Sequence, residues 1–165
     1  MHLFEDISEE ENKKYGPDTD GVDHINIYSN GKTSLGRFLS NFYRMSMKIE
    51  GKVFYSIEAY WYWLSLDSSL VSEEDDILLR HSSGYQAKST GRLLRKKYGT
   101  IECSDFQDRV CDAIHNKIIT SRFVDTFFSS TLPFEHYYVV YGRVIDVKKD
   151  HPWLLQYFED TRRNE

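Results

Sequence analysis

The sequence is poor in cysteine and in long apolar runs, and it has no excess of positive charge. Two cysteines, Cys103 and Cys111, are too few for a disulfide framework, so we expect a reduced, cytoplasmic protein. The chain has no run of about 18 apolar residues and no signal-like start, which argues against a membrane span and against export. A formal net charge of −5 argues against a protein that grips long duplex DNA through its phosphates.

Several signatures of well-known sites are missing too. The six histidines show no metal-type spacing with cysteines or acidic residues, so we expect no structural zinc and no metal or cofactor site. The chain contains neither the phosphate-binding loop G-x-x-x-x-G-K-[ST] nor the nucleophile motif G-x-S-x-G. A P-loop nucleotide site and Ser-His-Asp catalysis therefore have no support in the sequence.

What the chain does have is the composition of a folded domain. Hydrophobic residues make up 40% of the chain and charged residues 28%, which is typical of globular proteins and not of disordered ones. Aromatic residues make up 15%, so we expect an aromatic-rich core or pocket. A length of 165 residues fits one domain with a usable core. We expect a polar N-terminal arm over residues 1–23 and a single domain over residues 24–165.

Hydrophobic periodicity and turn residues predict short strands near both ends of a mainly helical chain. Strands are expected over 24–28 with a hairpin-type turn at Asn30-Gly31, over 45–49 paired with 53–55, and over 137–141 paired with 142–147. Helices are expected over 57–67, 73–80, 85–98, 104–119, 123–128 and 152–163. This order predicts an α+β fold, a helix-dominated single domain with small antiparallel strand groups.

The stretch from Phe38 to Leu66 is dense in aromatic residues and has an acidic residue at a predicted helix start. Ser56 is a good N-cap, and Glu58 falls in the first turn, where the helix dipole favours a charged carboxylate. Burial among aromatic rings acts in the opposite direction and raises the pKa of such a group. Core packing is the commoner reason for an aromatic run, and a stacking pocket beside an acid is the alternative.

These residues carry a resemblance to a known family. Leu39-Ser40-Asn41-Phe42-Tyr43, the following Gly51, and Ser56-Ile57-Glu58-Ala59-Tyr60 resemble the opening motifs of the NADAR superfamily, and Gln86 to Arg92 resembles its A-x-x-x-G-R segment. The segment from Phe106 to Lys117 resembles the next helix of that family. The family includes N-glycosidases that act on riboflavin-pathway intermediates and relatives that remove ADP-ribose from guanine bases.

The resemblance implies an N-glycosidase with Glu58 and Asn41 as its catalytic residues. We expect Glu58 to stabilise charge or to activate water, and not to donate a proton, and we expect Asn41 to orient Glu58 or the substrate. The expected substrate-binding residues are Arg37, Ser40, Phe42, Tyr43, Tyr62, Lys88 and Arg92. Of these, Phe42 and Tyr43 suit stacking, and the basic residues suit a phosphate or pyrophosphate. The implied partners are a small-molecule nucleotide or an ADP-ribosylated base, with nucleic acid as a further substrate.

Two other interpretations stay open. The family's His after the Glu is Ala59 here, its Gln is Tyr62, and its C-terminal loop is not recognisable, which favours a module that binds ADP-ribose or a nucleotide without turnover. A structural protein with an aromatic groove is the other alternative, and it predicts no nucleotide binding. Glu135 and His136 form either a surface pair or an acid–base pair that replaces the missing loop.

Overall fold

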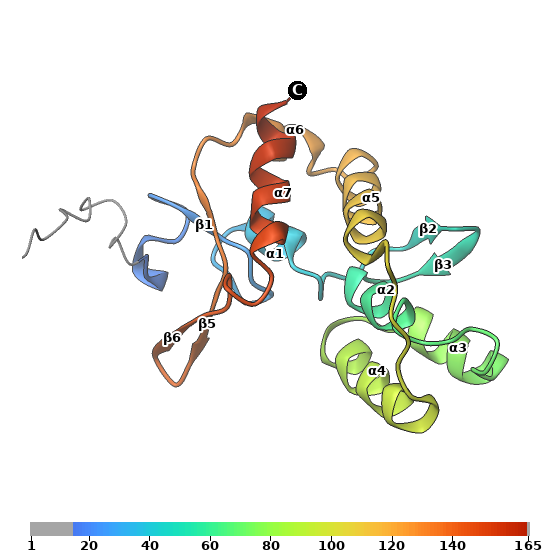
Figure 1. Cartoon of the computed structure of the whole chain (residues 1–165). Coiled ribbons are helices and arrows are strands. Elements are labelled where there is room, and N and C mark those ends of the chain that lie inside the picture. The colour runs from blue at the N-terminus through green and yellow to red at the C-terminus, as the bar shows by residue number, and fades with distance from the viewer. Residues whose placement is uncertain (1–14, 165) are drawn as a thin grey trace, which may run out of the picture.

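The structure is a computed structural model that describes residues 15–164, and it has an α+β fold (Figure 1). The short helix or arm expected over residues 1–14 lies outside the described range. The helices are α1 (Ser34–Leu39), α2 (Ile57–Trp63), α3 (Glu73–Arg80), α4 (Gly84–Tyr98), α5 (Phe106–Ile119), α6 (Val124–Ser129) and α7 (Pro152–Arg163), preceded by a short 3-10 turn, η1 (Pro17–Thr19). The strands are β1 (Ile25–Asn26), β2 (Met47–Ile49), β3 (Lys52–Phe54), β4 (Phe134–Glu135), β5 (Tyr137–Val140) and β6 (Arg143–Asp146).

Most of the predicted helices and two of the three strand pairs are confirmed. The β2–β3 and β5–β6 pairs are antiparallel hairpins, and α3 has the expected bounds. Helix α2 ends at Trp63 and not near Asp67, because the next residues continue in tighter turns in which Ser65 N donates to Tyr62 O (3.0 Å). Across residues 15–164, no helix is long and apolar enough to cross a membrane.

The hairpin predicted around Asn30-Gly31 is wrong. Strand β1 pairs in parallel with β4, which lies near the other end of the sequence. The turn itself forms, since Gly31 N donates to Tyr28 O (3.0 Å), but it leads into α1, a helix that was not predicted. Thr33 caps α1 by accepting a hydrogen bond from Gly36 N (2.9 Å). Local turn chemistry therefore gave the right turn and the wrong partner strand.

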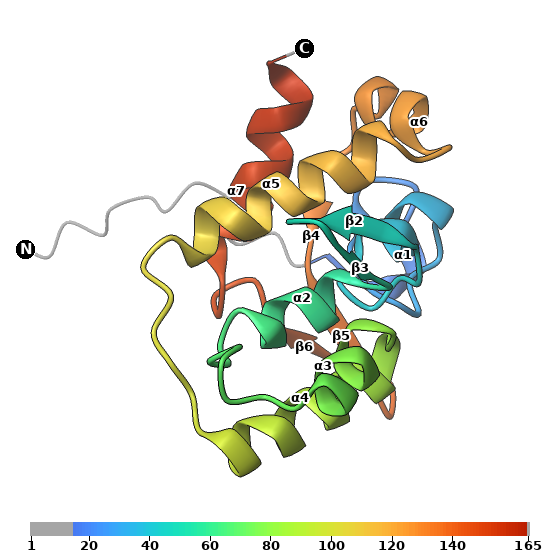
Figure 2. The same cartoon turned by 90° about the vertical axis from the view of Figure 1, so that its right-hand side faces the viewer.

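The chain folds into two sides that meet at the centre of the molecule. In Figure 1, β1, α1, the β5–β6 hairpin and α7 lie on one side, and α2, α3, α4 and the β2–β3 hairpin lie on the other. Figure 2 shows α2 between α5 and α4, and α2 contacts both of these helices. The first side thus combines the two ends of the described chain, and the second is built from its middle.

The end segments are joined by polar side chains that complete backbone pairing. The side chain of Asn26 donates from Nδ2 to Tyr137 O (2.9 Å), and its Oδ1 accepts from Tyr137 N (2.9 Å). Asn26 therefore extends the β1–β4 pairing onto β5 with its side chain. His24 adds a second link, because its Nε2 lies 2.6 Å from the Tyr137 hydroxyl oxygen.

The described part of the expected N-terminal arm packs onto the domain. Asp20 is buried, and its carboxylate accepts from the backbone N of Asn26 (3.0 Å) and of Lys32 (2.9 Å). The Tyr15 ring lies 4.8 Å from the His24 ring, centroid to centroid. Residues 15–23 are therefore part of the packed structure that supports β1.

Gly36 allows a close approach between α1 and β1 that a larger residue would not permit. A Cβ at this position would lie 2.2 Å from the carbonyl oxygen of Asn26, and that oxygen belongs to rigid backbone. Gly36→Ala should lower the free energy of unfolding by about 1–3 kcal/mol in a urea titration, although alanine is the better helix former. Gly16→Ala is the matched control, since nothing lies within 4 Å of its added Cβ. Equal stabilities for the two variants would contradict the close approach.

Candidate functional site

Each of the three carbonyl groups of the loop of residues 40–42 accepts a hydrogen bond from another element, and Ser40 O also accepts one from Tyr43 N (3.1 Å). The bonds run from Lys117 Nζ to Ser40 O (3.0 Å), from Glu58 N to Asn41 O (2.9 Å) and from Gly84 N to Phe42 O (3.1 Å). The donors come from α5, from the first turn of α2 and from the start of α4. Three elements therefore fix a short segment that has no regular structure of its own.

Lys117 reaches this loop from a buried position. Its side chain is 1% exposed, and Nζ lies 4.9 Å from the ring centroid of Phe38 and 5.5 Å from that of Tyr43. Burial lowers the pKa of Lys117 to about 7, since removal from water disfavours the ammonium form. The sequence showed Lys117 only as part of a helical pattern, and the structure shows that it supports Ser40.

The start of α2 is fixed as the sequence predicted. Ser56 Oγ accepts from Ala59 N (3.0 Å) and donates to Ser82 O (2.9 Å), so the cap is itself anchored to the end of α3. Because Glu58 N also bonds to Asn41 O, the first turn of α2 is tied to the loop 40–42 on one side. The carboxylate of Glu58 is thereby placed beside Asn41.

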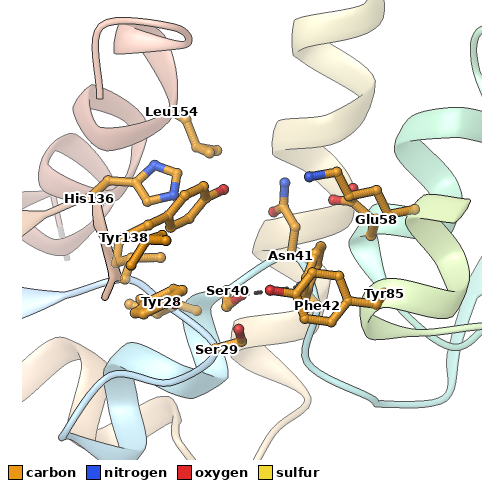
Figure 3. Close-up of a pocket in the computed structure, with 14 residues that line it drawn as sticks. Tyr28, Ser29, Ser40, Asn41, Phe42, Glu58, Tyr85, His136, Tyr138 and Leu154 are labelled. Carbon is orange, nitrogen blue, oxygen red and sulfur yellow. Dashed lines mark hydrogen bonds between the residues drawn. The ribbon is translucent and has the colours of Figure 1, made fainter. Parts of the chain in front are cut away.

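A cavity of about 140 Å³ lies where the two sides of the molecule meet (Figure 3). Its lining comes from segments that are far apart in the sequence. The lining residues are Ile27, Tyr28, Ser29, Leu39, Ser40, Asn41, Phe42, Glu58, Tyr85, Lys88, His136, Tyr138, Val140 and Leu154. Figure 3 shows His136 and Tyr138 on one side of the cavity, with Asn41 and Glu58 facing them.

Several polar side chains at the cavity make no side-chain hydrogen bond or ion pair within residues 15–164. The structure gives no side-chain hydrogen bond or ion pair to Asn41, Glu58, Lys88 or His136 in that range. None of their polar atoms is both buried and unsatisfied, so each is open to the cavity or its mouth. Polar groups with free bonding capacity, gathered at one concave site, are typical of a ligand site.

The sequence left open whether burial or the helix dipole has the larger effect on the pKa of Glu58. Burial raises the pKa of Glu58 to about 7, and the nearby positive charges of Lys88, Arg95 and Arg92 oppose that rise. Loss of hydration therefore outweighs the favourable position at the helix start. Near neutral pH, Glu58 therefore exists in both protonation states.

His136 forms the opposite side of the cavity together with alternate residues of β5. His136, Tyr138 and Val140 point the same way, because side chains two apart share a face of a strand. Burial, helped by the charge of His151, lowers the pKa of His136 to about 4, so its imidazole is neutral at pH 7. We call these three residues the strand wall. The β-prone run was predicted from its residues, but the sequence did not show that its alternate residues face Glu58.

The structure brings five of the nine predicted site residues to the cavity. These are Ser40, Asn41, Phe42, Glu58 and Lys88. Arg92 lies outside the cavity on the exposed face of α4, where a shallow depression also includes Lys88 and Tyr85. Arg37 does not reach the cavity, because its guanidinium donates to Gly31 O (2.8 Å) and to Lys32 O (3.0 Å).

Tyr43 and Tyr62 pack against protein and do not line the cavity. The Tyr43 ring meets the edge of Phe38, with centroids 5.2 Å apart. Tyr62 is buried beneath α4, where a Cβ on Gly91 would lie 2.1 Å from its Cγ. The close approach that Gly91 permits is thus between α4 and α2, and not between the backbone and a ligand.

Comparisons of the chain with protein-family models, with curated proteins and with solved structures gave no match. Within residues 15–164, no group of three or more His, Cys, Asp or Glu residues is placed to hold a metal ion. The site is therefore interpreted from its own geometry.

Replacing the Glu58 carboxylate should stabilise the protein at high pH. The pKa of Glu58 is raised in the folded state, so the folded protein binds the proton more tightly and loses stability as the pH rises from about 4.5 to about 7. Glu58→Gln should raise the free energy of unfolding by about 1–3 kcal/mol near pH 8 and by almost nothing near pH 4. Urea titrations at both pH values measure this difference.

The control for that prediction is Glu102→Gln, which alters an exposed glutamate outside the cavity. It should leave the unfolding free energy unchanged at both pH values. A Glu58→Gln protein that is no more stable than the wild type near pH 8 would show that the carboxylate is well hydrated.

Proposed function

We propose that the protein is an N-glycosidase that hydrolyses the bond between a sugar and a base in a ribosylated or ADP-ribosylated base. The observation that carries the proposal is that an unpaired carboxylate, Glu58, and an unpaired amide, Asn41, open onto the same aromatic cavity. The resemblance of residues 39–60 and 86–92 to the NADAR superfamily points to the same chemistry.

The size and lining of the cavity suit one flat ring. A volume of about 140 Å³ is close to the roughly 150 Å³ cavity that holds benzene in an engineered protein. Phe42 and Tyr85 form an edge-to-face pair with centroids 5.0 Å apart, and Tyr28 and Tyr138 form a tilted pair at 5.1 Å. Aromatic faces on two sides of the cavity favour a heterocyclic base between them.

Hydrolysis of the glycosidic bond needs a base for water and a charge near the sugar. The Glu58 carboxylate takes a proton from the attacking water, whose oxygen bonds to the anomeric carbon, and its negative charge stabilises the oxocarbenium-like transition state. The electron pair of the broken bond leaves with the base, which finally takes up one proton. Asn41, whose loop is tied to the backbone of Glu58, orients the water or a sugar hydroxyl.

The rest of a larger substrate has a basic surface to bind outside the cavity. Lys88 belongs both to the cavity and to the depression on α4 that includes Arg92 and Lys96. A phosphate or pyrophosphate attached to the sugar would meet these cations as the base enters the cavity. This arrangement supports a nucleotide-like substrate.

A second function is a module that binds ADP-ribose and releases no product. The observation in its favour is that Ala59, which stands where the family has a histidine, is fully buried and offers no polar group. Calorimetric titration with ADP-ribose, together with an assay for release of free base, separates the two functions. Tight binding without release of base indicates the module.

Glu58→Gln should abolish turnover while the fold stays intact. With ADP-ribosylated guanosine or a phosphoribosylated pyrimidine as substrate, the wild type should release free base, detected by chromatography and mass spectrometry. Its kcat/KM should rise with pH through about 7, because the pKa of Glu58 is raised to that range and the carboxylate is the active form. Asn41→Ala should lower kcat by about 10–100-fold, because it loses one hydrogen bond that orients the reaction.

Arg37→Ala is the matched control, since Arg37 bonds only to nearby carbonyl groups on a surface away from the cavity. It should retain wild-type turnover. Full activity of the Glu58→Gln protein would remove Glu58 from the mechanism.

A further inference from the structure

We propose that His136 is a catalytic residue that donates a hydrogen bond to the departing base from the side of the cavity opposite Glu58. This inference rests on the proposed N-glycosidase function and adds a second functional residue to it. His136 lies outside every motif that carries the family resemblance, so the argument for it comes from the cavity alone.

The position of His136 complements that of Glu58. Figure 3 shows the His136 ring pointing into the cavity from the strand wall, with Asn41 and Glu58 across from it. A glycosidic bond held between them has the sugar carbon near the carboxylate and the leaving base near the imidazole. Water activated by Glu58 then attacks on one side while the base departs toward the other.

The backbone on either side of His136 is fixed, which keeps the ring in place. The preceding residue, Glu135, accepts from Ile27 N (2.8 Å) and from Lys148 Nζ (3.0 Å). The following residue, Tyr137, has both of its backbone groups bound by the side chain of Asn26. The His136 ring also packs edge-on against Tyr138, with centroids 5.7 Å apart. Such support is what a preorganised donor requires.

The imidazole itself is free to bind a ligand. No hydrogen bond from residues 15–164 reaches either ring nitrogen of His136, and neither nitrogen is both buried and unsatisfied. The charged groups that influence it are His151, Asp146 and Asp150, and the balance leaves the imidazole neutral at pH 7. A neutral imidazole has one N–H to donate and keeps it throughout the reaction.

In the reaction, His136 stabilises charge and does not lose its proton. As the bond between sugar and base breaks, its electron pair moves onto the base, and the N–H of His136 bonds to a ring nitrogen or carbonyl oxygen where that charge gathers. Water supplies the oxygen on the anomeric carbon and, through Glu58 or solvent, the proton that the base takes up. A donor aimed at developing charge typically contributes about 100–1,000-fold to the rate.

The test compares two leaving groups on one sugar. One substrate is ADP-ribosylated guanosine or the phosphoribosylated pyrimidine, whichever the wild type cleaves, and the other carries 4-nitrophenol in place of the base. His136→Ala should lower kcat by about 100–1,000-fold on the first substrate and by less than about 10-fold on the second, because nitrophenolate needs no donor to leave. His136→Asn, which keeps an N–H, should recover part of the loss.

Two controls make the result specific. His115→Ala alters a histidine of α5 outside the cavity and should retain wild-type rates on both substrates. Glu58→Gln should lose activity on both, since attack by water is needed whatever the leaving group. Urea titration of each variant shows whether the fold is intact.

The outcomes distinguish this inference from the proposed function. Equal losses on the two substrates, or no loss on the natural base, would overturn the role of His136 while leaving the glycosidase standing. A wild-type protein that cleaves neither substrate would overturn the proposed function itself, and the role of His136 with it.

Discussion

The structure depends on the hydrogen bonds that hold the carbonyl groups of the loop 40–42. Backbone groups in a loop at the centre of a protein need partners, because leaving them unpaired away from water is costly. Here the partners come from three different helices, so one segment fixes the positions of α2, α4 and α5 relative to each other. The cavity exists beside this loop because the loop cannot collapse into it without breaking those bonds.

The same bonds couple the two groups that we assign to catalysis. Glu58 donates its backbone N–H to the carbonyl of Asn41, so the backbone positions that carry the carboxylate and the amide are held together. The arrangement has a cost, since both Glu58 and Lys117 are held where their charged forms are disfavoured, with pKa values shifted in opposite directions to about 7. Groups that reduce stability and yet persist are a recurring feature of functional sites.

Local signals in the sequence gave much of the fold. Ser56 was predicted as a cap and is one, and the turn before β3 forms at Glu50 and Gly51, both of which have positive φ (54° and 78°). The parallel pair β1–β4 could not be predicted, because each strand has two residues and their pairing depends on contacts between distant segments. Periodicity describes one element at a time and does not show which elements become neighbours.

The candidate site shows the same difference between what local sequence predicts and what depends on distant contacts. Asn41 and Glu58 could be predicted to lie together because they belong to one continuous stretch, and both line the cavity. Tyr62 and Arg37 were misplaced because the direction of a side chain depends on its neighbours, here Gly91 of α4 and the carbonyls before α1. His136 was left undecided because its significance appears only when β5 is laid opposite α2.

The cavity is lined by residues from early and late parts of the chain, and this has a consequence for protein synthesis. A nascent chain that has emerged from the ribosome only as far as α5 already has Asn41, Glu58 and Lys88, but it lacks the strand wall and Leu154. Because domains fold as units while translation proceeds, such an intermediate has only part of the cavity lining in place. Synthesis of the last helix, which carries Leu154, is therefore the step that completes the lining of the cavity.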